Sequence, residues 1–189
     1  MGKRELRSRI MERRAALGDR QADATAIRES LLEMPWVQMA GLVACYWSTG
    51  TEPATHGLVF ALWKHGATVI LPVLCEDHDL DWAVYDGPDS LAPGRYGVLE
   101  PIDARRGVAA IRTAALVIVP ALAVDRSSGI RLGRGGGSYD RALARVGPNV
   151  PTVALLYEGE LIDDLPAEPH DQRVRYAALP SGIVRIGGE

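Results

Sequence analysis

Short apolar runs alternate along the chain with stretches in which apolar residues recur every three or four positions. The runs are continuous and rich in β-branched residues, which is typical of strands that are buried on both faces of a sheet. They occupy residues 42–47, 68–72, 116–119 and 152–157. Residues 80–84 instead alternate apolar with polar or small side chains, which predicts a half-exposed, antiparallel strand.

Amphipathic helices are predicted between these strands. In residues 3–17, Leu6, Ile10 and Leu17 fall on one stripe of a helix. Other helices are predicted at 23–34, 54–64, 139–143 and 158–165, with a short one near 105–112. Residues 86–112 are rich in Pro, Gly and Arg and are expected to form a long loop over a site.

The alternation of strands and helices predicts an α/β fold, a three-layer sandwich with a mainly parallel sheet and helices on both faces. A chain of 189 residues without an internal repeat or linker is expected to form a single domain over 1–189. The strands that end near Trp47, Pro72, Pro120 and Tyr157 would share one edge of the sheet, where open α/β folds bind ligands.

Composition narrows the class of protein. Apolar residues make up 47% and charged residues 24% of the chain, as in an ordinary globular protein. A net charge of −3 argues against general nucleic-acid binding. Cys45 and Cys75 show no spacing that suits zinc. With no signal peptide and no apolar run of membrane length, we expect a cytoplasmic protein without a membrane partner.

The stretch after the strand at 116–119 carries the most distinctive chemistry. Gly133, Gly135, Gly136 and Gly137 surround Arg134, and a helix is predicted to follow. Glycines let backbone N–H groups converge on an anion, and a helix start favours phosphate. Neither the Walker pattern nor GxGxxG is present. The loop alone fits a phosphate cradle and a structural turn equally well; the nearby arginines, including Arg131, favour phosphate.

Other charged residues are ambiguous by themselves. Lys3 and Arg7 are four apart and project from one helix face, which is typical of a solvated basic surface. Arg14, one heptad further, is in position to extend that strip. Glu52 follows a strand and precedes a helix, where spacing alone favours a carboxylate held by the helix dipole. Asp125 is either a catalytic helper or a turn residue, and a turn is the simpler interpretation.

The residues around Glu52, at 48–53, are predicted to form a turn that leads directly into the helix at 54–64. Thr51 is in position to cap that helix, and Pro53 suits a first helical turn.

A resemblance to a known family adds to this interpretation. Residues 119–141, VPALAVDRSSGIRLGRGGGSYDR, resemble the signature of the 5-formyltetrahydrofolate cyclo-ligase family, also called methenyltetrahydrofolate synthetases. KRELR at 3–7, STGTEPAT at 48–55, GVLEP at 97–101 and PHD at 169–171 are similar to further family segments in the same order. The resemblance spans nearly the whole chain.

The resemblance implies an enzyme that cyclises 5-formyltetrahydrofolate to 5,10-methenyltetrahydrofolate and converts ATP to ADP and phosphate. It implies reduced folate and ATP as small-molecule partners and Mg²⁺ as the metal. We also expect a monomer. The implied ATP-binding residues are Lys3, Arg7, Arg131, Gly133, Arg134, Gly135, Gly136, Gly137, Ser138 and Tyr139. The implied folate-binding residues are Trp47, Glu52, Arg134, Gly135, Gly136, Gly137 and Ser138. Arg134 is the implied catalytic residue, and Asp140 and Asp171 are the implied metal ligands.

Two positions depart from the family pattern. Ser138 stands where the family usually has an aromatic residue, and Arg175 stands where an acidic residue is common. Two alternatives therefore stay open: a non-catalytic ATP-binding regulatory module, and a related ATP-dependent ligase that acts on another small substrate.

Overall fold

A central sheet organises the computed structural model, which describes residues 2–187. It has seven strands in the order β12-β11-β9-β6-β1-β2-β3. These are β1 (Leu42–Ala44), β2 (Thr68–Leu74), β3 (Leu80–Tyr85), β6 (Leu116–Pro120), β9 (Thr152–Leu155), β11 (Tyr176–Leu179) and β12 (Gly182–Arg185). The inner strands pair in parallel, and β3 and β12 close the two edges in antiparallel pairing.

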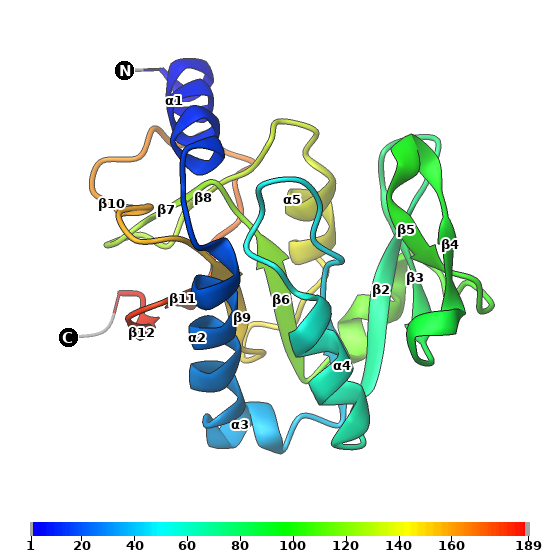
Figure 1. The fold of residues 1–189 in the computed structure, drawn as a ribbon. Helices are drawn as coiled ribbons and strands as arrows, with labels where there is room; N and C mark the ends of the chain where they lie inside the picture. The colour runs from blue at the N-terminus through cyan, green and yellow to red at the C-terminus, as the bar shows by residue number, and fades with distance from the viewer. Residues whose placement is uncertain (1, 188–189) are drawn as a thin grey trace.

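Helices cover both faces of this sheet (Figure 1), which confirms the predicted sandwich. On one face lie α2 (Arg20–Leu32), α3 (Pro35–Gln38) and α4 (His56–Lys64). Their residues Ile27, Val37 and Leu58 pack with side chains such as Val43 and Ile118 of the strands. The opposite face carries α5 (Ser138–Leu143) and the 3-10 helix η3 (Val108–Thr113), in a second apolar cluster.

The first helix, α1 (Lys3–Ala15), does not join either of these clusters. It packs on a small sheet of order β10-β7-β8, formed by β7 (Ala123–Asp125), β8 (Arg131–Leu132) and β10 (Leu161–Ile162). Leu6 and Ile10 of α1 contact apolar residues such as Leu122 and Leu132. The small sheet thus presents α1 beside the segment that precedes the glycine loop.

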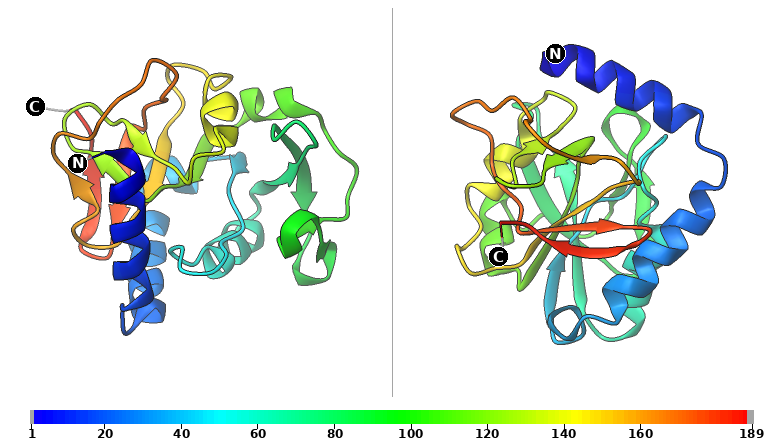
Figure 2. Two further views of the ribbon diagram at one scale, coloured as in Figure 1. Left: turned by 90° about the horizontal axis from the view of Figure 1, so that it is seen from above. Right: turned by 90° about the vertical axis from the view of Figure 1, so that its left-hand side faces the viewer.

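The predicted loop at 86–112 is more ordered than expected. It contains the short helices η1 (Pro88–Ser90) and η2 (Arg95–Gly97) and a hairpin of β4 (Leu91–Pro93) and β5 (Leu99–Pro101). The short helix predicted near 105–112 is η3. From above, the hairpin and α1 lie on opposite sides of α5 (Figure 2). The strand β3 is antiparallel as predicted, and Leu80 and Trp82 are buried, but the alternation then breaks, because Ala83 and Tyr85 are buried and Val84 is only partly so.

Two local predictions are wrong. Residues 158–165 form no helix, because Leu161 and Ile162 pair with β7 instead, and this tertiary pairing outweighs local helix propensity. Thr51 caps no helix and Pro53 lies outside the first helical turn, since α4 begins only at His56. The segment 48–55 is instead closed by Thr55, whose hydroxyl donates to Tyr46 O and accepts from Ser48 N.

Arg14 does not extend the basic strip either. Its side chain is buried and forms an ion pair with Glu160. No helix among residues 2–187 is long and apolar enough to span a bilayer.

Candidate functional site

A cavity of about 610 Å³ lies where the parallel strands end. Its walls come from α1, the segments after β1 and β6, the glycine loop, the β4–β5 hairpin and the loop at 168–171. Every residue that the sequence analysis assigned to the site lines this cavity: Lys3, Arg7, Trp47, Glu52, Arg131, Gly133, Arg134, Gly135, Gly136, Gly137, Ser138, Tyr139, Asp140 and Asp171.

The glycine loop has the properties of an anion cradle. Gly135 and Gly137 adopt φ angles of 107° and 70°, a region that favours glycine. Gly137 is also the residue that precedes the first turn of α5. Within the described residues, the backbone amides of 134–137 donate no hydrogen bond. These N–H groups are therefore available to an anion at the cavity wall.

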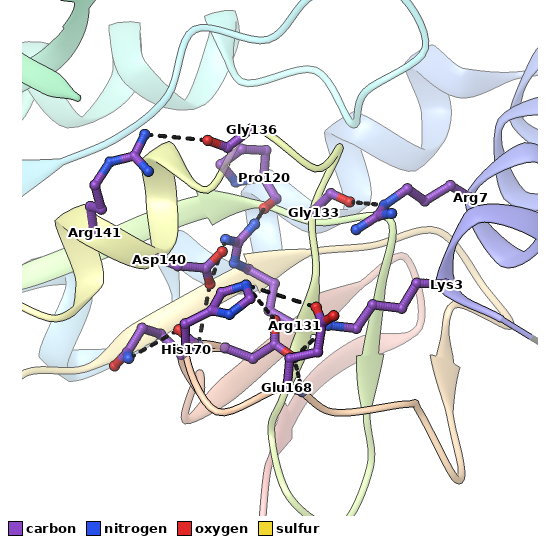
Figure 3. Close-up of polar contacts among 12 residues, drawn as sticks. Lys3, Arg7, Pro120, Arg131, Gly133, Gly136, Asp140, Arg141, Glu168 and His170 are labelled. Atoms are coloured by element: carbon purple, nitrogen blue, oxygen red, sulfur yellow. Dashed lines mark hydrogen bonds and ion pairs between the residues drawn. The ribbon is translucent and has the colours of Figure 1, made fainter. Parts of the chain in front are cut away.

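Cationic side chains surround this loop (Figure 3). Arg7 donates from Nε to Gly133 O at 2.8 Å, which fixes α1 against the loop. A Cβ placed on Gly135 would lie 3.6 Å from the guanidinium carbon of Arg7. The Arg7 guanidinium thus lies beside the glycine loop, which places a positive charge next to it.

Arg131 and Asp140 form the floor below the loop. The Arg131 guanidinium is buried and donates to Pro120 O at 3.0 Å and to Asp140 Oδ1 at 3.1 Å. It also lies over the ring of Tyr139, 5.7 Å from the centroid. Gln172 N donates to the same Asp140 oxygen at 3.2 Å. Asp140 Oδ1 is thus held by two donors, the Arg131 guanidinium and the backbone amide of Gln172.

Lys3 and Asp171 meet although they are 168 positions apart in sequence. Lys3 Nζ lies 2.6 Å from Asp171 Oδ2 and 2.7 Å from Glu168 Oε2. Burial by itself would raise the pKa of Asp171, but the hydrogen bonds from Lys3 and from Glu168 N hold that pKa below its usual range. Asp171 is therefore a carboxylate at neutral pH, with a cation already beside it.

Glu52 marks the other half of the cavity. Its Oε2 accepts a hydrogen bond from Thr49 N at 2.8 Å, and its Oε1 lies 3.5 Å from Arg134 Nη2. The Glu52 carboxylate is mostly buried, whereas the Arg134 side chain is half exposed. Arg134 therefore connects the glycine loop with the segment that follows β1.

Aromatic rings line this half as well. Trp47 stacks on His56 with ring centroids 4.1 Å apart. His56 is held by Ser48 O, 3.0 Å from its Nε2. Burial and the nearby Glu52 carboxylate raise the pKa of Tyr139 well above its usual range, so its hydroxyl stays neutral. A flat, partly apolar ligand would find both a ring surface and an acidic group here.

The carboxylates of Asp140 and Asp171 suit a hard divalent cation. Mg²⁺ needs only one or two carboxylates together with phosphate and water oxygens. Among the described residues, Asp140 Oδ2 accepts no hydrogen bond, and Asp171 Oδ1 has only His170, at 3.9 Å, beside it. Each carboxylate thus retains an oxygen that could bind a metal, and the donor set fits Mg²⁺.

Several residues of the cavity have no role assigned from the sequence. Glu168, Pro72, Leu74 and Leu80 are among them, whereas Arg95, Val98 and Leu99 belong to the loop that was expected to lie over a site. The acidic and His-containing run at 168–171 was a usable sign, because ligand atoms of Glu168, His170 and Asp171 lie within 4.8 Å of one another. Pro72, Leu74 and Leu80 had no comparable sign, because the strands β2 and β3 meet the rest of the cavity only in the fold.

Asp125 is a turn residue, which agrees with the simpler interpretation. Its Oδ1 accepts hydrogen bonds from the amides and hydroxyls of Ser127 and Ser128, and its Oδ2 accepts one from Leu165 N. The side chain is buried and does not line the cavity. Its role is to hold the loop between β7 and β8.

Comparisons with known proteins agree with the resemblance. The model of the 5-formyltetrahydrofolate cyclo-ligase family matches residues 1–180. A 5-formyltetrahydrofolate cyclo-ligase of Mycolicibacterium smegmatis is 36% identical over 192 residues, with 95% of this chain and 98% of the relative covered. The Escherichia coli K12 protein of the same name is 31% identical over 179 residues, with 92% and 98% covered.

Solved structures give the same result. The 5,10-methenyltetrahydrofolate synthetase of Aquifex aeolicus has a TM-score of 0.85 at 25% identity, with 100% of this chain and 95% of that chain covered. A synthetase of Mycoplasma pneumoniae has the same fold, with a TM-score of 0.75 at 18% identity over 94% of this chain and 98% of that chain. The predicted resemblance is confirmed, and the chain belongs to the 5-formyltetrahydrofolate cyclo-ligase family.

Proposed function

We propose that this protein cyclises 5-formyltetrahydrofolate to 5,10-methenyltetrahydrofolate and converts ATP to ADP and phosphate. Family membership supports the folate substrate. The observation that supports the ATP-dependent part is the glycine loop, whose amides at 134–137 donate no hydrogen bond within the described residues and which lines the same cavity as Arg7, Trp47 and Glu52. One cavity thus offers an anion cradle and an aromatic, acidic pocket side by side.

The reaction explains why both halves are needed. A formamide carbon is a weak electrophile, and its oxygen leaves poorly. Transfer of the γ-phosphoryl group from ATP to the formyl oxygen breaks the β–γ bond and releases ADP. N10 of the folate then attacks the activated carbon and loses its proton, and the C–O bond breaks as the oxygen departs with the phosphate, which can take up that proton. Enzymes of phosphoryl transfer act mainly by positioning and charge neutralisation, and no side-chain nucleophile is required.

The proposed roles follow from where the side chains lie. Lys3, Arg7 and the loop amides hold the polyphosphate, while Trp47 and Glu52 orient the pterin end of the folate. Arg134 lies at the boundary and contacts Glu52 from the glycine loop. It is therefore the residue best placed to stabilise charge on the phosphoryl group in transfer. Arg131 and Tyr139 support this floor through their mutual contact.

Asp140 and Asp171 are the residues that would hold Mg²⁺. When bound, the metal neutralises phosphate charge. The chain's own contribution is to keep Asp140 fixed by Arg131 and Gln172 N and to keep Asp171 ionised beside Lys3. A cytoplasmic location, a monomeric state and the lack of a nucleic-acid partner remain predictions from the sequence.

The test is an assay of methenyl product by absorbance, run together with ADP release and with Mg²⁺ or ATP omitted in turn. We expect one ADP per methenyl product, and no product without ATP or Mg²⁺. ATP binding without turnover would instead indicate a regulatory module. ATP turnover without any response to this folate would indicate a ligase for another substrate.

The variant Asp140→Asn tests whether Asp140 binds the metal or only stabilises the fold. Asp140→Asn is expected to lose most activity and to need more Mg²⁺ for ATP binding, because an amide binds Mg²⁺ far more weakly than a carboxylate. Its thermal midpoint is measured in parallel, since Asp140 also neutralises the buried Arg131. Wild-type turnover of a folded Asp140→Asn at low Mg²⁺ would remove Asp140 from the metal site.

A further inference from the structure

Arg141 lies outside the cavity yet contacts the glycine loop. It follows Asp140 on α5, and it is not among the residues that line the cavity. Its Nη2 donates to Gly136 O at 3.2 Å and to His78 O, in the turn between β2 and β3, at 2.7 Å. Figure 3 shows the contact between the Arg141 guanidinium and the Gly136 carbonyl.

This contact determines which way one peptide group faces. The described chain has no cis peptide bond, and in a trans peptide the C=O and the following N–H point in opposite directions. Because Arg141 holds the Gly136 carbonyl, the Gly137 N–H must point away from Arg141. Gly136 and Gly137 line the cavity while Arg141 does not. The Gly137 N–H therefore points away from Arg141 and toward the cavity.

The surroundings show that Arg141 also limits the loop sterically. A Cβ on Gly137 would lie 3.0 Å from Arg141 Nη1, so the guanidinium packs closely on the loop. Gly137 has a φ of 70°, which leaves its flanking peptide groups free to rotate if nothing restrains them. Peptide groups that must turn before binding lower affinity, because ordering them costs free energy at that moment.

We propose that Arg141 is a positioning residue that presets the Gly136–Gly137 peptide for binding of the ATP polyphosphate. The proposal rests on the proposed function for the identity of the anion. Arg141 touches no substrate atom in this assignment. It acts through the loop, by occupying a carbonyl that would otherwise be free to turn toward the phosphates and repel them.

Arg145 provides a matched control. It lies four positions after Arg141 and attaches the same region of the chain to the same turn, through a bidentate ion pair with Asp79 at 2.8 and 2.5 Å. No hydrogen bond or ion pair of Arg145 in the described residues reaches the glycine loop. Both arginines therefore attach their segment to the turn between β2 and β3. Of the two, only Arg141 also contacts the glycine loop and can preset its peptide group.

The experiment measures ATP and tripolyphosphate affinity by calorimetry, and KM and kcat with the folate, for the wild type, Arg141→Ala, Arg141→Lys and Arg145→Ala. Arg141→Ala is expected to lower the affinity for ATP and for tripolyphosphate by about five- to tenfold. It should also raise the KM for ATP more than it lowers kcat. Arg141→Lys keeps a donor and a charge, so it should recover most of the affinity. Arg145→Ala should lower the thermal midpoint but leave both affinities within about twofold of the wild type.

Two results would overturn the proposal. One is a folded Arg141→Ala variant that binds both anions with wild-type affinity. The other is an equal loss of anion affinity in Arg145→Ala, which would show that attachment to the turn between β2 and β3 explains the effect. A wild-type protein that binds tripolyphosphate but forms no methenyl product contradicts the proposed function and leaves the comparison of the two arginines valid. A wild-type protein that binds neither anion would overturn both.

Discussion

At the scale of single residues, the ion pair between Arg134 and Glu52 joins the two halves of the cavity. Their side chains lie 3.5 Å apart, one from the glycine loop and the other from the segment after β1. The family resemblance implies that Arg134 contacts both substrates and that Glu52 contacts the folate alone. Because the two side chains are in contact, their effects on binding are expected to be coupled.

Arg134→Ala is expected to raise the KM for ATP by roughly tenfold and the KM for folate by less. A charge-assisted contact to phosphate is worth about 1.5–3 kcal/mol, and the half-exposed side chain favours the lower end of that range. Glu52→Gln should weaken the folate and leave ATP binding nearly unchanged. Steady-state kinetics in which each substrate is varied in turn will measure both effects.

The double variant tests the coupling. Arg134→Ala with Glu52→Gln should show less than the sum of the two single effects on the folate, because each single change already removes the ion pair. Arg112→Ala is the control, since Arg112 is exposed and does not line the cavity. Equal effects of both single variants on both substrates would contradict the division of the cavity into two halves.

At the scale of elements, α1 is held to the rest of the molecule by a buried ion pair. Arg14 donates from Nε and Nη2 to the two carboxylate oxygens of Glu160 at 2.8 and 2.7 Å, and also to Ala121 O at 2.6 Å. Both side chains are almost fully buried. Glu160 also accepts from Tyr157 N, so the pair connects α1 with the end of β9. This connection positions the Lys3 and Arg7 end of the helix.

Arg14→Ala is expected to lower the free energy of unfolding by about 3–5 kcal/mol, because it leaves the Glu160 carboxylate buried without a partner. Urea unfolding followed by fluorescence will measure the change. Combining Arg14→Met with Glu160→Met should be less destabilising than Arg14→Ala, since the uncompensated charge is then absent. A loss below about 1 kcal/mol in Arg14→Ala would show that α1 docks through its apolar face alone.

At the scale of the whole molecule, carboxylates tie distant segments together. Asp79 binds Arg145, and Asp125 accepts hydrogen bonds from Leu165 N as well as from the serines beside it. The hydrogen bond from Arg145 lowers the pKa of Asp79. Burial would raise the pKa of Asp125, but its hydrogen bonds hold the pKa well below the usual range.

These depressed pKa values predict loss of stability in acid. A group whose folded pKa is depressed stabilises the fold fully above its unfolded pKa of about 3.9, and this contribution is lost as the pH falls through the folded pKa. The free energy of unfolding should therefore begin to decrease below about pH 5 and should keep decreasing as the pH falls past about 3.9 toward the folded pKa values. In Asp125→Asn the decrease should be smaller, since the amide does not titrate; an unchanged slope would contradict the role of Asp125.

Much of the fold was predictable from the sequence, because the period of apolar residues is a local property. The runs at 116–119 and 152–157 predicted the parallel strands β6 and β9, and the stripe of Leu6 and Ile10 predicted α1. The glycine loop was recognisable because a left-handed backbone requires glycine at particular positions. The resemblance supplied the chemistry, and the structure brings all of its residues to one cavity.

Tertiary structure alone decided which of these residues are partners. Lys3 and Asp171 are separated by 168 positions, and no local pattern relates them. The strand β10 exists because Leu161 and Ile162 find β7, although the local sequence favours a helix. The local sequence predicts a surface position for Arg14, whereas in the fold Arg14 is buried in an ion pair with Glu160. Local sequence sets the conformation of most segments, whereas packing between distant segments decides the exceptions, such as β10, and which charges are neutralised or remain free for a ligand.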